Sequence, residues 1–193
     1  MTKSTKSQPT RLCSSHLQRL SMNSHIATLP VLDISAFLLD ENSPGGKKVV
    51  EDLLQICNTV GFVYITGHGI PESVDSSVLD LTRTFFELPE SDRLAIVNTQ
   101  SPHFRGYTRL GMEHTNGAPD WREQIDIGPE CAPVALAPHD PAWLRLRGPN
   151  QWPPALPALR PAVSDWMARM EALSCTILRA LALGLGHPAD HFD

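Results

Sequence analysis

The sequence predicts an α+β fold in which amphipathic helices alternate with short strands. Three observations support this prediction. Apolar residues recur at helical spacing in three segments, at 45–61, 71–89 and 161–185. Short runs rich in β-branched and aromatic residues lie between the helices, at 31–34 and 62–66. Nine of the 17 prolines fall between residues 129 and 161, which favours an irregular connecting segment there.

Composition limits the architecture and the classes of partner. A chain of 193 residues fits one core-bearing domain with a tail. The formal net charge is -5 and the basic residues are scattered, which argues against a nucleic-acid or anionic-lipid partner. No apolar run approaches the roughly 20 residues of a membrane span. The four cysteines form no C-x-x-C pair, which indicates neither a zinc site nor a disulfide framework and favours a reducing cytoplasm.

Residues 1–28 are predicted to form a disordered tail. They are rich in Ser and Thr, carry scattered Lys and Arg, and precede the first acidic residue, Asp33. An organelle transit peptide has a similar composition and remains an alternative. Met22 lies just ahead of the first predicted strand and is a second possible start of translation.

The first structured segment begins with a short strand at 31–34. A helix follows from Gly45 and is expected to end at Gly61. The run 62–66 is predicted to be a buried strand that turns at Gly67 and Gly69.

The next elements follow the same logic. A helix is predicted from Pro71 to Pro89, and a shorter helix at 90–97. Strands are expected at 105–110 and 124–127, on either side of a polar loop.

Six sequence strings, taken together and in this order, resemble the isopenicillin N synthase-like Fe(II)/2-oxoglutarate-dependent dioxygenases. They are Gly61–Ile65, Gly67–Pro71, Phe85–Pro89, Arg105–Tyr107, Asp120–Gly128 and Gly148–Pro153. Each string is a weak signal alone, but a chance match of all six in the same order is very improbable. The resemblance extends over about residues 30–193.

This resemblance implies the N-terminal lobe of a dioxygenase, whose double-stranded β-helix (jelly-roll) core is absent from this chain. It divides the sequence into the tail, a non-haem dioxygenase N-terminal domain at 29–128, a Pro-rich connecting segment at 129–160, and a long helix within 161–193 that leads to the catalytic barrel. The missing barrel is then the expected partner, and a small molecule the expected substrate of the complete enzyme.

The iron ligands of the family, an H-x-D triplet and a later His, are not expected here. The chain holds one such triplet, His191-Phe192-Asp193, but composition alone predicts about one by chance. No His follows it, so we interpret it as a linker. The family's Arg-x-Ser clamp for 2-oxoglutarate occurs only as Arg19-Leu20-Ser21, in the tail. We therefore assign no catalytic and no metal-binding residue, and expect Fe(II) and 2-oxoglutarate to bind the complete family enzyme and not this chain.

By the same resemblance, Arg105 and Tyr107 are candidate substrate-binding residues. Residues two apart on a strand share a face, and an Arg could pair with a substrate carboxylate while a Tyr hydroxyl orients it. The alternative is a solvated Arg105 and a Tyr107 that packs at the lobe interface. His68, in its Gly-rich turn, is expected to be a hydrogen-bonded turn residue and not a ligand.

The sequence thus predicts the N-terminal part of an oxidoreductase that is inactive alone. Two alternatives stay open. One is a truncated, non-catalytic product that binds a partner. The other is an oxidase of the same group that does not use 2-oxoglutarate, which only the absent Arg-x-Ser could distinguish.

Overall fold

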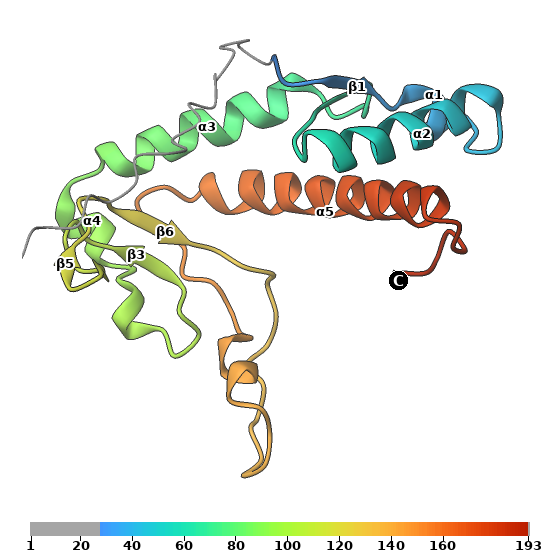
Figure 1. Cartoon of the computed structure of the whole chain (residues 1–193). Helices are drawn as coiled ribbons and strands as arrows, with labels where there is room; N and C mark the ends of the chain where they lie inside the picture. Colours follow the sequence, from blue (N-terminus) through green and yellow to red (C-terminus); the bar gives the residue numbers. More distant parts are fainter. Residues whose placement is uncertain (1–27, 193) are drawn as a thin grey trace, which may run out of the picture.

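The computed structural model describes residues 28–192. The long helix α5 (Leu159–Gly184) runs through the molecule, and helices α2 (Pro44–Thr59) and α3 (Glu72–Glu87) pack along one side of it (Figure 1). The fold is α+β, as predicted. Residues 1–27 of the predicted disordered tail, with the Arg19-Leu20-Ser21 triplet, lie outside the described residues.

The first unit is a βαβ arrangement. Strands β1 (Val31–Asp33) and β2 (Tyr64–Thr66) pair in parallel, and α1 (Ser35–Leu39) and α2 connect them. Helix α1 was not predicted from the sequence. Its five residues are too few to show helical periodicity, and it begins where the Asp33 carboxylate accepts the backbone N–H of Ser35 at 2.8 Å.

Helix α2 begins and ends where the sequence predicts. The Ser43 hydroxyl accepts the backbone N–H of Gly46 at 3.0 Å, and Pro44 occupies the first turn, where its missing N–H costs nothing. A Cβ on Gly46 would lie 2.3 Å from the Asp40 carbonyl oxygen, so this position requires glycine. Gly61 follows the helix with a φ of +78°.

Two hydrophobic clusters hold the elements together. The first joins the βαβ unit to the C-terminal half of α5 through Leu32, Ile34, Phe37, Val49, Leu53 and Ala180. The second joins α3, β3 and the N-terminal half of α5 through Phe85, Ile96, Tyr107, Leu159 and Val163. The Trp166 indole N–H also donates to Asp75 at 2.8 Å, which fixes α5 to the first turn of α3.

The strand β2 is not buried, and the prediction of a buried strand at 62–66 was wrong. Tyr64 is 62% exposed and Phe62 is 70% exposed. The reason is that β2 belongs to a two-stranded sheet, and one of its faces lies free of the described helices.

Strands β3 (Gly106–Thr108) and β6 (Gln124–Asp126) form an antiparallel pair, close to the predicted ranges. The short helix α4 (Glu90–Leu94) and the 3-10 turn η1 (Asn98–Gln100) precede them.

Between these strands, where the sequence predicts a polar loop, lies a small hairpin. It consists of β4 (His114–Thr115) and β5 (Ala118–Pro119), turning at Asn116 and Gly117, both with positive φ.

The Pro-rich segment follows β6 and descends away from the helices as an irregular loop (Figure 1), as predicted. Its one regular piece is the 3-10 turn η2 (Ala142–Leu146). Within residues 28–192, no helix combines the length and the apolar character that a membrane span requires.

Candidate functional site

Tyr107 lies at the centre of the second cluster and is 1% exposed. Its hydroxyl donates to the Glu123 carboxylate at 2.5 Å, and the Arg93 guanidinium donates to the same carboxylate oxygen at 2.6 Å. The Arg93 guanidinium carbon also lies 5.4 Å from the Tyr107 ring centroid. Burial of the phenol, together with its hydrogen bond to Glu123, raises the pKa of Tyr107 to about 12.

The Arg105 guanidinium donates hydrogen bonds to backbone carbonyls. One terminal nitrogen donates to the carbonyl of His103 at 3.1 Å and more weakly to that of Phe104, and the other donates to Leu146 at 3.1 Å. The guanidinium lies so close to Gly128 that a Cβ there would meet it at 2.3 Å. Arg105 and Tyr107 thus contact different groups, and a direct contact of either with substrate stays a prediction.

The loop at 148–153 fastens β3 to the rest of the lobe. The Gln151 amide donates to three carbonyls, including that of Arg105 at 2.7 Å. The buried His103 ring contacts the Arg145 carbonyl through Nδ1 at 2.8 Å and packs so tightly on Gly148 that a Cβ there would lie 2.3 Å from the ring. This string of the resemblance therefore has a structural role.

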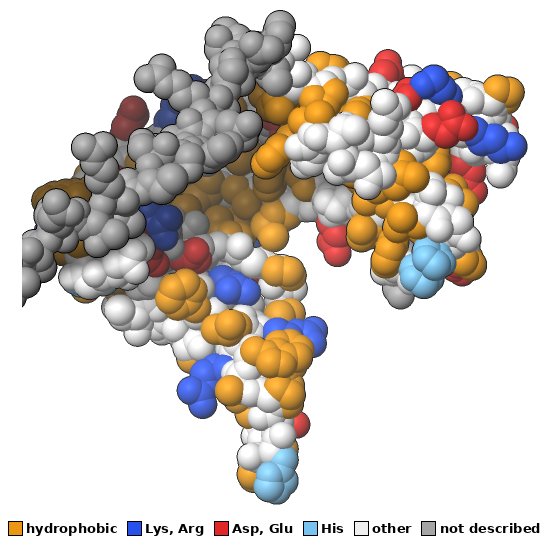
Figure 2. All heavy atoms as spheres, in the orientation of Figure 1, with side chains coloured by type: hydrophobic (Ala, Val, Ile, Leu, Met, Phe, Trp, Pro, Cys, Tyr) orange, Lys and Arg blue, Asp and Glu red, His pale blue; other side chains and the backbone are white. Residues whose placement is uncertain are grey.

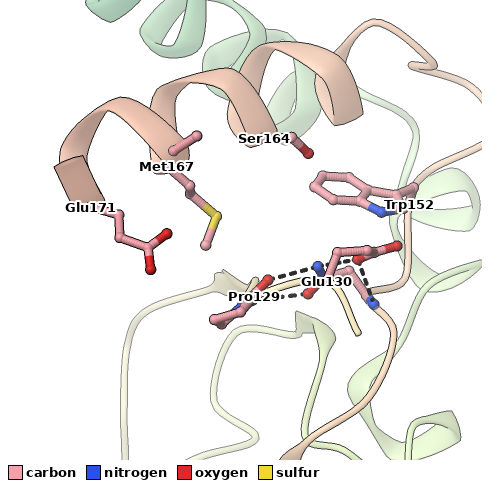
Figure 3. Close-up of a pocket in the computed structure, with 9 residues that line it drawn as sticks. Pro129, Glu130, Trp152, Ser164, Met167 and Glu171 are labelled. Atoms are coloured by element: carbon pink, nitrogen blue, oxygen red, sulfur yellow. Dashed lines mark hydrogen bonds between the residues drawn. The ribbon is translucent and has the colours of Figure 1, made fainter. Parts of the chain in front are cut away.

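A cavity of about 490 Å³ lies between α5 and the segment that leaves β6 (Figure 3). Pro129, Glu130 and Trp152 form one wall, and Met167 and Glu171 project from α5 on the other.

The Glu130 carboxylate accepts the backbone and side-chain N–H groups of Asn150 and the guanidinium of Arg160. Burial acts to raise the pKa of Glu130, but the Asn150 hydrogen bonds act against it and the pKa is lowered.

The face of α5 on this side is open. Ser164, Ala168, Glu171, Cys175 and Leu178 recur at helical spacing along it, and all five are exposed. In the space-filling view, hydrophobic side chains gather in the hollow between the helices and the descending Pro-rich segment (Figure 2). Ser164, Ala168 and Glu171 also line the cavity, so the segment after β6 faces this part of α5 across it, and Cys175 and Leu178 lie beyond its lining residues.

The described residues do not fit an iron site. Within residues 28–192, no group of three or more His, Cys, Asp or Glu side chains could hold a metal ion. The His191 ring stacks on His187 with centroids 4.2 Å apart, in the turn after α5. Asp193 lies outside the described residues. His68 accepts the backbone N–H of Ile70 through Nδ1 at 3.1 Å, which confirms its role as a turn residue.

Several residues of this region were not found from the sequence. Arg93 and Glu123 are ordinary charged residues 30 positions apart, and no local pattern connects them. Gln151 lies within one of the six strings, but that string does not indicate its hydrogen bonds to three carbonyls. Phe104, the neighbour of Arg105, has a φ of +54°, which no residue preference would have indicated.

Comparison with known proteins identifies the family. The model of the non-haem dioxygenase N-terminal domain, described as "non-haem dioxygenase in morphine synthesis N-terminal", matches residues 29–155. The chain belongs to this family.

Named relatives agree. The chain is 40% identical over 167 residues to the 2-oxoglutarate-dependent dioxygenase frbJ of a Dothideomycetidae species, covering 86% of this chain and 44% of the relative. It is 34% identical over 178 residues to a homoarginine-6-hydroxylase of Glycine max, covering 89% of this chain and 53% of the relative. The chain therefore spans about half the length of the curated relatives it matches.

Solved structures show the same correspondence. A full-length Neurospora crassa protein in complex with alpha-KG superposes with a TM-score of 0.67 at 26% identity, over 86% of this chain and 49% of that one. A putative 2OG-Fe(II) oxygenase family protein from Caulobacter crescentus superposes with a TM-score of 0.66 at 21% identity, covering 85% and 50% of the two chains, which supports the fold alone.

Proposed function

We propose that this chain forms the N-terminal lobe of an Fe(II)- and 2-oxoglutarate-dependent oxygenase that acts on a small molecule, and that the lobe docks a jelly-roll barrel supplying the iron and 2-oxoglutarate ligands. The observation that carries the proposal is the open face of α5, next to a cavity of about 490 Å³, in a chain that matches about half of each relative.

The open face has the properties of a surface made for close packing. Ser164, Ala168 and Cys175 are small, so a sheet can approach the helix backbone, and Leu178, at 42% exposure, offers apolar area beyond them. The neighbouring cavity is lined on its α5 side by Met167, whose flexible thioether suits a packing role.

The proposal has a consequence for the activity of the isolated lobe. It does not hold Fe(II) or 2-oxoglutarate, so we expect the isolated chain to be inactive. The complete protein would couple oxidative decarboxylation of 2-oxoglutarate to oxidation of its substrate. Within the lobe, Arg105 and Tyr107 are the candidate substrate-binding residues, as the resemblance of their strand to the family implies. The cytoplasm is the expected compartment, because Cys57, Cys131 and Cys175 are free thiols.

Two measurements test the proposal. Intact mass of the native gene product should be about twice that of this chain, as the relatives' lengths imply. A native product no heavier than this chain, which also turns over 2-oxoglutarate, would contradict it.

The second measurement concerns the open face. The isolated chain should self-associate and bind a hydrophobic dye, as size-exclusion chromatography with light scattering can show, because the face lacks its cover. Leu178→Lys should reduce both effects. Leu79→Lys is the matched control, since Leu79 is 57% exposed on α3, a different helix, and it should change neither. Equal effects of the two substitutions would remove the open face from the proposal.

A further inference from the structure

A second cavity, of about 380 Å³, lies beside β3, away from the open face of α5. Its wall is formed by Leu94 at the end of α4, by Val97 just before η1, by Phe104 ahead of β3, and by Met112 before the hairpin. Phe104 is 51% exposed and Met112 is 62% exposed, so the wall presents apolar side chains to an open mouth.

The backbone conformation of Phe104 is unfavourable. Its φ of +54° is in the left-handed region, which disfavours residues with a Cβ. Within residues 28–192 the other non-glycine residue with positive φ is Asn116, and an Asn before Gly117 is ordinary in a hairpin turn. A bulky aromatic residue in this conformation is a strained position, and such positions persist where the surrounding structure enforces them.

Neighbouring residues hold Phe104 in this conformation. The Arg105 guanidinium donates to the Phe104 and His103 carbonyls, and Gln151 donates to the Arg105 carbonyl at 2.7 Å. His103 is itself held by the Arg145 carbonyl at 2.8 Å. These hydrogen bonds hold the backbone on both sides of Phe104, and none of them involves its ring. The ring is therefore the group that the clamp leaves free to contact something else.

The two charged side chains that line the cavity, Arg109 and Glu113, already form ion pairs. The Asn98 amide donates to the Thr108 hydroxyl at 2.7 Å, and Arg109 forms an ion pair with Glu90 at 2.7 Å. A charged ligand would find no uncompensated partner among these groups. An aromatic ring would stack on Phe104 and contact the Met112 thioether, both of which are favourable contacts for it.

We infer that Phe104 is a substrate-contacting residue that presents its ring to an aromatic group of a neutral small molecule, and that Arg105 is the positioning residue that holds Phe104 in its strained conformation. This inference rests on the proposed function, because it names the class of molecule that the substrate side of the lobe takes.

Binding of 4-fluorophenol to the full chain, followed by fluorine NMR, tests the inference without iron or turnover. The probe should bind wild type, and Phe104→Gly should weaken binding at least tenfold, while Phe104→Tyr retains it. Phe62→Gly is the matched control, because Phe62 is 70% exposed elsewhere, and it should leave binding unchanged. Arg105→Lys, which cannot hold the two-pronged contacts with the carbonyls, should weaken binding in part.

The melting temperatures of two variants distinguish the effect of backbone strain from the effect of losing the ring. Phe104→Gly and Phe104→Ala both remove the ring, but only glycine relieves the backbone, so the Gly variant should melt a few degrees above the Ala variant. Equal melting temperatures, no binding to wild type, or equal binding to Phe104→Gly would each overturn the inference. None of these results bears on whether a barrel completes the enzyme, which the intact mass decides.

Discussion

Replacing Tyr107 by Phe removes one hydroxyl from an aromatic side chain that is only 1% exposed. That hydroxyl donates to a Glu123 carboxylate that Arg93 also contacts. A hydrogen bond to a charged group contributes about 1.5–3 kcal/mol, and the lower end applies here because the Glu123 side chain is 31% exposed. We therefore expect Tyr107→Phe to lower the free energy of unfolding by about 1.5 kcal/mol at pH 7.

The same substitution should change the pH dependence. An unfolded tyrosine releases its proton near pH 10, whereas in the folded lobe the pKa of Tyr107 is about 12. Between these values the unfolded state holds fewer protons, so stability falls as the pH rises. The contribution is fully present below pH 10 and amounts to roughly 2–3 kcal/mol lost by pH 12, at about 1.4 kcal/mol per unit. Tyr107→Phe should abolish this alkaline loss.

The assay is urea denaturation followed by circular dichroism at pH 7 and at steps between pH 9 and 12. Tyr64→Phe is the matched control, because Tyr64 is the chain's other tyrosine and is 62% exposed. It should change stability by less than about 0.5 kcal/mol. If Tyr107→Phe behaved as Tyr64→Phe does at every pH, the Tyr107–Glu123 contact would not hold the lobe together.

Two further substitutions test local structure. Ser43→Ala should destabilise the lobe by about 1 kcal/mol in the same denaturation assay, because it removes the N-cap of α2, whereas Ser43→Asp should retain most of the stability; equal losses would refute the capping role. Gly148→Ala should cost about 1–3 kcal/mol, because the new Cβ would lie 2.3 Å from the His103 ring, and an unchanged midpoint would show that the ring moves freely.

Much of the fold follows from local sequence. Helices α2 and α3 have apolar stripes and terminating Gly or Pro residues, and α2 also has the Ser43 cap. These signals act within a few positions, so the bounds of the two helices are predictable. The strand at 62–66 shows the limit. Its composition indicates burial, but whether a strand is covered depends on a partner face that composition does not contain.

Only the approximate location of the candidate site was predictable from the sequence. The strings around Arg105 and Tyr107 identify the strand, but the partners that decide what each side chain does come from distant positions. Glu123 reaches Tyr107 across the β3–β6 pair, and Leu146 reaches Arg105 from the Pro-rich segment. The strain at Phe104 is a backbone property, and it arises from the clamp around it and not from the residue itself.

The central claim, that this chain is the lobe of an enzyme whose barrel carries the iron chemistry, is tested most directly by joining the two halves. A chimera would replace the N-terminal half of the Dothideomycetidae relative frbJ with residues 30–192 of this chain. Succinate formation from 2-oxoglutarate would be measured with Fe(II). The chimera should form succinate in an Fe(II)-dependent manner, and residues 1–193 alone should form none. Succinate formation by the isolated chain, or a folded, iron-loaded chimera that forms none, would contradict the claim.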